Sequence, residues 1–185
     1  MFKENELSAG DLLLITRNNY FWSKEYPDLE FIANGDVAEL VRIKRYHDMY
    51  GLRFVDVTLR FLDYDCEIDT RLLIDSLYTE TPAAAEQLAK KLFAAVEEDY
   101  LEIGNRRTRY KAMMQNEYLN ALQVKFGYAV TCHKAQGGQW SEVFIDQGGL
   151  TPEQIDTDYL RWLYTACTRA EKNLFFINFS DQFFD

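Results

Sequence analysis

Two short segments of this 185-residue chain combine small, hydroxyl, amide and basic side chains in an order that suits anion binding. The first runs from Tyr128 to Gln139 and reads YAVTCHKAQGGQ. Its apolar start is expected to be a strand that stops at Thr131. A helix beginning there would direct unpaired backbone N–H groups at an anion, beside the Thr131 hydroxyl. Such groups position a phosphate backbone without base specificity. An ordinary strand-to-helix turn is the alternative, and a lone His133 is more often a plain surface or core residue.

The second segment, residues 163–170, reads LYTACTRA and is expected to lie on a helix. At about 100° per residue, Arg169 lies about 180° from Leu160, away from the apolar stripe predicted for this helix. The guanidinium therefore does not cover the core, and it could stabilise charge on a phosphoryl group in a cleft. A single arginine on an exposed helix face is the alternative. The predicted stripe consists of Leu160, Leu163, Tyr164 and Cys167.

The composition is that of a folded domain. Apolar residues make up 48% and charged residues 27% of the chain, so it can bury a core. The three cysteines are odd in number and widely spaced, which fits neither a disulfide framework nor a zinc site. No apolar run approaches the roughly 20 residues of a membrane helix, and the first residues do not resemble a signal peptide. These features predict a cytoplasmic protein with no membrane partner and no bound metal.

The formal net charge of −10 argues against a free-standing nucleic-acid binder, because such proteins neutralise phosphates. The stretch between Asn105 and Lys134 is basic instead. It holds a single acid, Glu117, and the basic residues Arg106, Arg107, Arg109, Lys111, Lys125 and Lys134. The stretch is a candidate DNA contact, and a solvated helix face is the alternative.

The hydrophobic pattern changes along the chain. The run at residues 12–15, LLLI, predicts a strand buried on both faces, as in a parallel sheet. Residues 55–61 and 68–72 instead alternate apolar with polar side chains, which predicts antiparallel strands in a small sheet or barrel.

Helices are expected at three places. Thr81 and Pro82 open the first, where Leu88, Leu92 and Val96 share one face. A second is expected over residues 113–122. The third is expected between strands at residues 143–145 and 174–177, after a capping box at residues 151–154. The fold class is thus α/β, a parallel sheet interrupted by an insertion at about residues 21–125.

The two segments, in this order and about 30 residues apart, resemble motifs V and VI of superfamily 1 helicases, most closely the RecD/Dda-like branch that includes the exodeoxyribonuclease V alpha subunit. Gly10-Asp11, Asn18-Asn19-Tyr20 and Asn34-Gly35-Asp36 resemble that branch's entry into its SH3-like subdomain. The resemblance implies that residues 1–20 and 126–185 form part of the second RecA-like domain, of the P-loop NTPase type. Residues 21–125 would be an inserted SH3-like β subdomain with a helical extension.

The resemblance also implies a role for each matching residue. Thr131 and His133 would contact single-stranded DNA or couple it to the nucleotide. The resemblance assigns no role to the helix and basic stretch of the insertion. Lys134, Asn19, Arg106, Arg107 and Arg109 are further candidate DNA contacts. Gln136 and Gly137 would shape the loop at the ATP cleft. Gln139 stands where many relatives have Glu near the ribose, so this residue departs from the pattern. Arg169 would be the arginine finger on the γ-phosphate, supported by Thr168 and Tyr164.

A helicase motor also needs a phosphate cradle of the type G-x-x-x-x-G-K-[ST], and the chain contains no Gly-Lys pair. ATP and Mg²⁺ are therefore expected only in a whole motor, with an N-terminal RecA-like domain supplied in cis or in trans. Other recombination or repair subunits are further expected partners, and this chain alone is expected to lack ATPase activity.

Two alternatives remain open at this level. The chain could be a non-catalytic module, a degenerate helicase remnant that binds nucleic acid or protein. It could also be an enzyme with a nucleophile at Cys132-His133, although adjacent residues at a strand end point in opposite directions.

Overall fold

The computed structural model describes residues 6–26, 29–64, 66–150, 154–180 and 183. The chain divides into two compact parts, residues 1–128 and 129–185. We refer to them as the barrel unit and the C-terminal unit, and each is described by itself.

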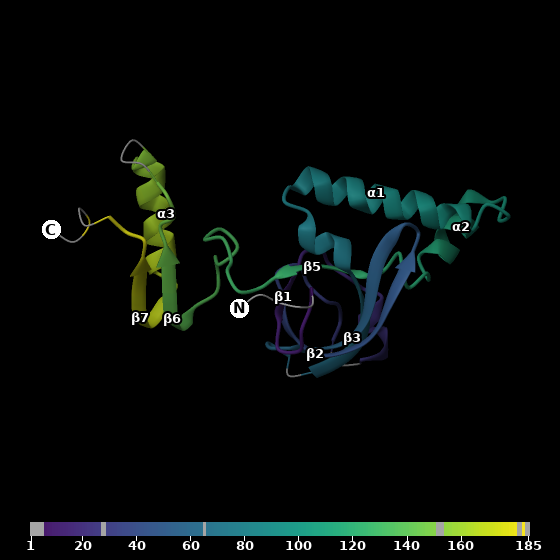
Figure 1. Ribbon diagram of the computed structural model, residues 1–185, viewed down its shortest axis with the longest axis horizontal. Helices are drawn as coiled ribbons and strands as arrows, with labels where there is room; N and C mark the ends of the chain where they lie inside the picture. Colours follow the sequence, from purple (N-terminus) through teal and green to yellow (C-terminus); the bar gives the residue numbers. More distant parts are fainter. Residues whose placement is uncertain (1–5, 27–28, 65, 151–153, 181–182, 184–185) are drawn as a thin grey trace. The chain divides into compact units, whose positions relative to one another are not determined.

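The barrel unit is built around five strands in a closed barrel of order β1-β2-β3-β4-β5 (Figure 1). Most neighbours are antiparallel, and a short parallel pairing of β4 with β5 closes the barrel. The 3-10 turns η1, Trp22–Glu25, and η2, Ile74–Tyr78, follow β1 and β4. The strands are β1, Leu12–Ile15; β2, Val37–Met49; β3, Leu52–Phe61; β4, Cys66–Leu73; and β5, Leu122–Phe126.

The alternating strands confirm the prediction of a small antiparallel barrel. On β3, every second side chain from Val55 to Phe61 is buried in the main core, where Ile68 and Leu72 of β4 join it. The prediction for β1 is wrong. This strand pairs antiparallel with both β2 and β5, so residues 1–20 belong to the barrel and not to a parallel sheet with residues 126–185. A closed barrel can bury a short apolar strand as fully as a parallel sheet does, so the apolar run does not distinguish the two.

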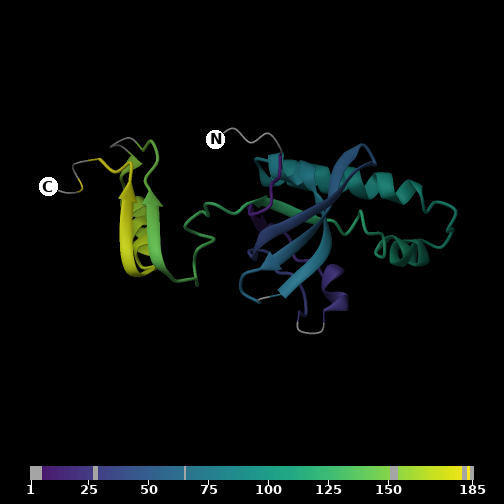
Figure 2. The ribbon, with the colours of Figure 1, turned by 60° about the horizontal axis from the view of Figure 1, so that its bottom comes forward.

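Two helices extend the barrel unit beyond its strands on one side (Figures 1 and 2). Helix α1, Pro82–Glu98, begins as predicted, with the Thr81 hydroxyl accepting a hydrogen bond from the Ala84 amide at 3.2 Å. Helix α2 spans Arg106–Met113, so the prediction of a helix over 113–122 is wrong. The Asn116 side chain accepts from the amides of Tyr118 and Leu119, and this local bonding replaces a helical turn.

The helical extension has a core of its own. Phe54 and Leu73, which point away from the barrel interior, are buried together with Leu92 and Val96 of α1 and Met113 of α2. The barrel unit therefore has two adjoining cores, one inside the barrel and one between the barrel and the helices.

The C-terminal unit is a β-α-β arrangement. Strand β6, Trp140–Asp146, pairs in parallel with β7, Ala170–Ile177, and helix α3, Thr157–Cys167, connects them. These strands and this helix confirm the prediction for residues 143–177. Two details differ. The helix is capped by Asp156, whose carboxylate accepts from the Tyr159 amide at 2.9 Å, whereas Thr151–Glu153 of the expected capping box lie outside the described residues. Residues 128–131 form no strand.

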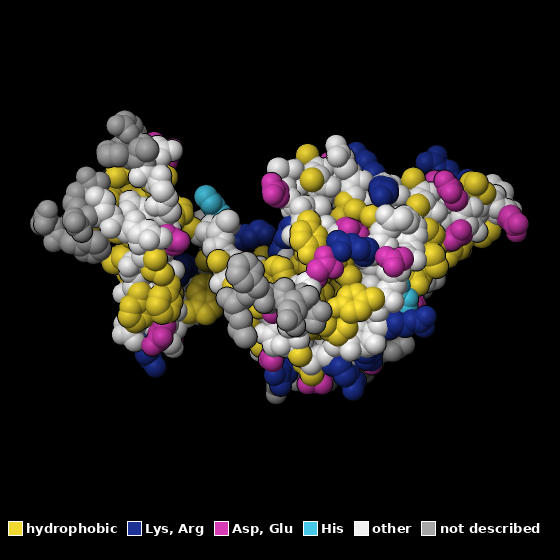
Figure 3. All heavy atoms as spheres, viewed as in Figure 1, with side chains coloured by type: hydrophobic (Ala, Val, Ile, Leu, Met, Phe, Trp, Pro, Cys, Tyr) yellow, Lys and Arg dark blue, Asp and Glu magenta, His cyan; other side chains and the backbone are white. Residues whose placement is uncertain are grey.

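The apolar stripe predicted for α3 is wrong in its direction. Tyr159 and Ala166 are the buried residues of the helix, whereas Leu160 is 57% and Tyr164 73% exposed. Helix α3 covers one face of the strand pair (Figure 2), and several large apolar side chains of this unit are exposed on its surface (Figure 3).

No helix in the described part of the chain is both long and apolar enough to cross a membrane.

Candidate functional site

The segment after Tyr128 folds as a series of turns rather than the predicted regular helix. The Thr131 carbonyl accepts from the amides of Lys134 and Ala135, at 2.9 and 3.1 Å, and the Ala135 carbonyl accepts from the Gly138 amide. Ala135 is buried and Cys132 is half-buried. The turns therefore hold these two side chains against the unit, and the side chains between them project into solvent.

The residues singled out in this segment are those that project. All are exposed, and their side chains make no hydrogen bond or ion pair with the described residues. The structure thus brings together on one turn a hydroxyl, an imidazole, an ammonium and two amides that are open to a ligand. They are Thr131, His133, Lys134, Gln136 and Gln139.

The local structure requires a glycine at both positions of the Gly137-Gly138 pair. Gly137 has a φ of +90°, which a side chain would strain. A Cβ on Gly138 would lie 2.3 Å from the Trp140 ring, so the glycine lets this ring pack directly on the backbone. The Gly-Gly pair therefore shapes the end of the turn.

Arg169 follows the last turn of α3 and reaches this segment. Its Nη1 donates to the Gly138 carbonyl at 3.1 Å, its Nε to the Thr165 carbonyl at 3.1 Å, and its Nη2 to the Thr168 hydroxyl at 3.1 Å. The backbone carbonyl of Arg169 also accepts from the Trp140 amide at 2.9 Å. The guanidinium is half-buried and is held at the edge of the turn, and one N–H on each terminal nitrogen has no acceptor among the described residues.

The Cys132 thiol is not arranged as a nucleophile. It donates to the Trp162 carbonyl at 3.4 Å, and burial raises the pKa of Cys132, although the Arg169 charge acts in the opposite direction. A raised pKa keeps the thiol protonated, and a protonated thiol is a poor nucleophile. His133 is exposed and makes no hydrogen bond to this sulfur within the described chain. The Cys-His alternative is therefore unsupported.

The N-terminal motif residues lie in the barrel unit, where their side chains build turns. Asp11 accepts from the Ser8 amide and Asp36 from the Ala33 amide, both at 2.8 Å. Asn18 accepts from the Asn34 amide at 2.7 Å. Asn19 accepts from the amides of Phe21 and Trp22 and donates to the Asn120 carbonyl at 2.9 Å. The Asn19 side chain thus holds a loop in place, which gives it a structural task apart from the DNA contact expected of it.

The basic stretch is divided between structural and exposed residues. Arg109 lies 3.7 Å from Glu97, and the Lys125 ammonium donates to the carbonyls of Leu77 and Thr79. Arg106, Arg107 and Lys111 are exposed on α2. Two of the six cations are therefore engaged in holding the barrel unit together.

The sequence patterns did not predict a charge cluster that forms around the buried Arg71 on β3 and β4. Arg71, 7% exposed, binds Asp56 through Nε at 2.6 Å and Nη2 at 3.2 Å, and its Nη1 lies 3.2 Å from Glu117. His47 lies 2.5 Å from the same Asp56. The alternating pattern already placed Asp56 and Arg71 on the outer face. Their pairing required the register of β3 with β4, which the sequence does not state.

A comparison with protein families gives a match to the C-terminal unit. Residues 126–177 match the family model of the UvrD-like helicase C-terminal domain. The match begins at the last residue of β5 and ends at the last residue of β7. It supports a helicase C-terminal domain here, and with it DNA binding in general terms.

Among curated proteins, the chain is similar to the uncharacterized protein R530 of Acanthamoeba polyphaga mimivirus. The two are 33% identical over 55 residues, which cover 30% of this chain and 11% of that protein. The matched part therefore spans only a small share of that relative.

Proposed function

We propose that this chain contributes the C-terminal part of an ATP-dependent DNA helicase of the RecD-like branch. In this proposal the C-terminal unit is a portion of the second RecA-like domain, and the barrel is an inserted SH3-like subdomain. The family match over residues 126–177 supports the helicase class. The RecD-like branch and the subdomain identities rest on the sequence motifs.

The observation that carries the proposal is the contact between Arg169 and Gly138. These residues belong to the two motif segments, lie 31 positions apart and are joined by a 3.1 Å hydrogen bond. The bond holds a cation beside a turn with five exposed polar side chains. Such convergence suits a site in which one segment senses DNA and the other reaches the nucleotide.

Arg169 fits a triphosphate oxygen. Three of its N–H groups fix the guanidinium plane, and the remaining two can bind an anion in a forked geometry. Gln136, Gly137 and Gln139 would line the nucleotide beside it. When bound, ATP supplies the phosphoryl group that passes to water. Mg²⁺ would enter with the nucleotide in the whole motor.

The exposed side chains of the turn at residues 131–139 would make the DNA contacts. Thr131, His133 and Lys134 offer a hydroxyl, an imidazole and an ammonium to a phosphate backbone. A strand bound there would lie next to the backbone that holds Arg169, so displacement of the turn would move the guanidinium. This linkage would couple DNA binding to ATP hydrolysis.

The proposal is tested by mixing the full chain with an N-terminal RecA-like domain of the RecD-like branch, or by joining the two in one polypeptide. We expect DNA-stimulated ATPase activity only when both parts are present. An arginine finger contributes about 10³–10⁵ in rate, so Arg169→Ala should abolish turnover, and Arg169→Lys should restore little because it lacks the fork.

Two results would count against this function. Robust turnover by the chain alone that depends on Arg169 would contradict a site divided between two parts. Failure of both the mixed and the joined forms to hydrolyse ATP would contradict the helicase assignment. Arg161→Ala, which removes an exposed cation of α3 paired only locally with Asp158, is the matched control.

The second candidate is a non-catalytic module that binds nucleic acid or protein. The net charge of −10 favours a protein partner for most of its surface. Under this alternative Arg169→Ala would leave every partner affinity unchanged, and no added domain would restore ATP hydrolysis.

A further inference from the structure

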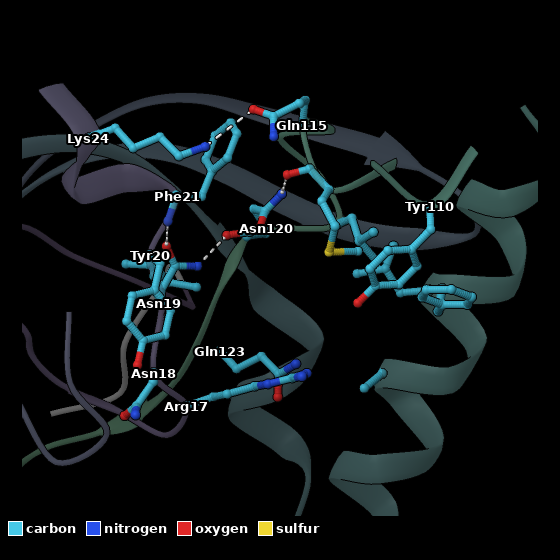
Figure 4. A pocket seen from close by; sticks show the side chains of 17 residues that line it. Arg17, Asn18, Asn19, Tyr20, Phe21, Lys24, Tyr110, Gln115, Asn120 and Gln123 are labelled. Atoms are coloured by element: carbon cyan, nitrogen blue, oxygen red, sulfur yellow. Dashed lines mark hydrogen bonds between the residues drawn. The ribbon is translucent and has the colours of Figure 1, made fainter. Parts of the chain in front are cut away.

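A cleft of about 570 Å³ lies in the barrel unit, between the loop after β1 and the helical extension. One wall is formed by residues 17–24, and the other by parts of α1, α2 and the turns that follow α2. In Figure 4, Lys24 and Gln115 lie at one end of the cleft, Arg17 and Gln123 at another, and Tyr110 faces them across the opening. The helical extension, to which the family resemblance assigns no role, thus forms one wall of the cleft.

The charge of the cleft differs from that of the whole chain. The protein has 30 acidic and 20 basic residues, yet none of the residues that line the cleft is acidic and two, Arg17 and Lys24, are basic. The Arg17 side chain is exposed and makes no ion pair with the described residues. An unpaired cation beside amides and no carboxylate is an arrangement suited to an anionic ligand.

Aromatic side chains stand next to these cations. Tyr110 is 53% exposed and tilts against Phe93, with ring centroids 6.5 Å apart. Tyr20 is 61% exposed and stacks on Phe31 at 5.0 Å. Each ring is supported by a neighbouring ring and still has exposed surface. Single-stranded nucleic acids bind to such surfaces because every base can stack on an aromatic ring.

The cleft is held open by bonds between its two walls. The Asn120 carbonyl accepts from Asn19 Nδ2 at 2.9 Å and from Trp22 Nε1 at 2.8 Å. Lys24 Nζ donates to Gln115 Oε1 at 3.2 Å. These contacts fix the loop against the turns after α2, so little ordering is needed when a ligand enters.

We propose that this cleft binds one or two nucleotides of single-stranded DNA, separately from the turn at residues 131–139. Arg17 and Lys24 contact phosphates, a base stacks on Tyr110, and Gln115 and Gln123 face the base edges. Arg107, three residues before Tyr110, shares a face of α2 with it by helical spacing and extends the basic surface beyond the cleft. A neutral polypeptide would not require the two cations, Arg17 and Lys24. The choice of DNA rests on the proposed helicase function.

The test measures binding of the full chain to a fluorescent oligodeoxythymidylate by anisotropy at several salt concentrations. We expect the double variant Arg17→Ala, Lys24→Ala to weaken binding and to reduce the slope of log K against log salt by about 1.4, as two lost phosphate contacts require. Tyr110→Ala should weaken binding about fivefold or more, and Tyr110→Phe should restore it because the stacking ring is retained.

The matched control is Arg45→Ala, Lys90→Ala, which removes two exposed cations of the barrel unit that do not line the cleft. Circular dichroism of each variant verifies that it is folded. Equal losses in the double variant and its control would overturn the proposal. The absence of oligonucleotide binding at low salt would also overturn it and would leave the cleft to a polypeptide.

The failure of this proposal is distinguishable from that of the proposed function. If Lys134→Ala removes all DNA binding and the cleft variants remove none, the cleft proposal is wrong and the helicase site stands. If the cleft variants weaken binding but ATPase activity is never reconstituted, the cleft binds DNA and the helicase assignment is wrong.

Discussion

The barrel unit buries most of its large apolar side chains, whereas the C-terminal unit leaves many of them exposed. In the barrel unit, cores on both faces of β3 and β4 enclose phenylalanine, leucine and valine side chains almost completely. The C-terminal unit has few buried hydrophobic residues, among them Ile145, Tyr159 and Ala166. Its exposed large apolar side chains are Val130, Trp140, Phe144, Leu150, Leu160, Tyr164, Phe175, Phe176 and Ile177.

The difference follows from sheet type. Parallel strands are normally covered on both faces, and β6 and β7 are a parallel pair with a helix on one face only. Phe144 and Phe175 stack on each other at 4.6 Å, yet both remain exposed. The C-terminal unit thus exposes apolar surface that a larger sheet would cover, whereas the barrel has no open edge among its five strands.

Hydrogen exchange should show the largest difference between the two units. Amides of β3 are protected by a closed barrel, and those of β6 and β7 by one pairing and one helix. We expect exchange in β6 and β7 to be about 1000-fold faster or more, because local opening there exposes little buried surface. Mass-spectrometric exchange at neutral pH measures this. Equal protection would mean that the C-terminal unit is as stable as the barrel.

Two phenylalanines offer a matched pair of substitutions. Phe54 is fully buried between the barrel and α1, so Phe54→Ala should reduce the free energy of unfolding by about 3–5 kcal/mol. Phe144 is 62% exposed, so Phe144→Ala should change the free energy of unfolding by less than about 0.5 kcal/mol. Urea denaturation of both variants makes the comparison. A large loss for Phe144→Ala would show that its exposed ring is buried in solution.

Two arginines allow the same comparison for ion pairs. Arg71→Ala leaves Asp56 without its bidentate partner and should cost about 3 kcal/mol of unfolding free energy. Arg161→Ala removes an exposed pair in the C-terminal unit and should cost less than about 1 kcal/mol. Thermal denaturation of each variant tests the difference, and equal costs would contradict the assigned burial of Arg71.

A smaller effect is expected from pH. Burial would raise the pKa of Asp56, but hydrogen bonds from Arg71 and His47 outweigh it and hold that pKa below its usual value. A lowered pKa stabilises the folded state above the unfolded value of about 3.9, and this stabilisation is lost as pH falls through the folded pKa. Asp56→Asn should therefore make stability less dependent on pH below about 4.

The exposed Asp146 of the C-terminal unit is the control for this measurement. Its pKa is lowered by hydrogen bonds from the Gly148 amide and the Asn178 side chain, but the carboxylate is fully exposed. Asp146→Asn should change the acid dependence less than Asp56→Asn does. Urea midpoints between pH 2 and 6, a range chosen to bracket the carboxyl values, measure both. The reverse order would contradict the stabilisation of the Asp56 carboxylate by Arg71 and His47.

Local signals predicted some elements well. The start of α1 follows from a hydroxyl cap and a proline in its first turn, and β3 and β4 follow from alternation over several residues. These features depend on residues that are close in sequence. The geometric expectation for Arg169 is not confirmed, because it took the side of Leu160 as the buried face of the helix, and Leu160 is exposed whereas Arg169 is half-buried.

Other features depend on partners that the sequence does not name. The LLLI run is buried by β2 and β5, and β5 lies more than 100 residues further along the chain. The face of α3 that packs on β6 and β7 carries Tyr159 and Ala166, although Leu160 and Tyr164 are equally apolar. The motifs of the sequence indicate the candidate site at residues 131–139 and Arg169. The cleft at Tyr110 is formed by the packing of α1 and α2, and no pattern of residues in the sequence predicts this cleft.

The pairing of β1 with β5 also determines when the barrel unit can finish folding. Leu13 meets Phe126, so the ribosome must release more than 110 further residues before the first strand gains this neighbour. Until then β1 and β4 each lack one lateral partner, and their unpaired amides and carbonyls are open to intermolecular strand pairing. Because α1 and α2 are synthesised between β4 and β5, they can form on the nascent chain and cover Phe54 during this interval.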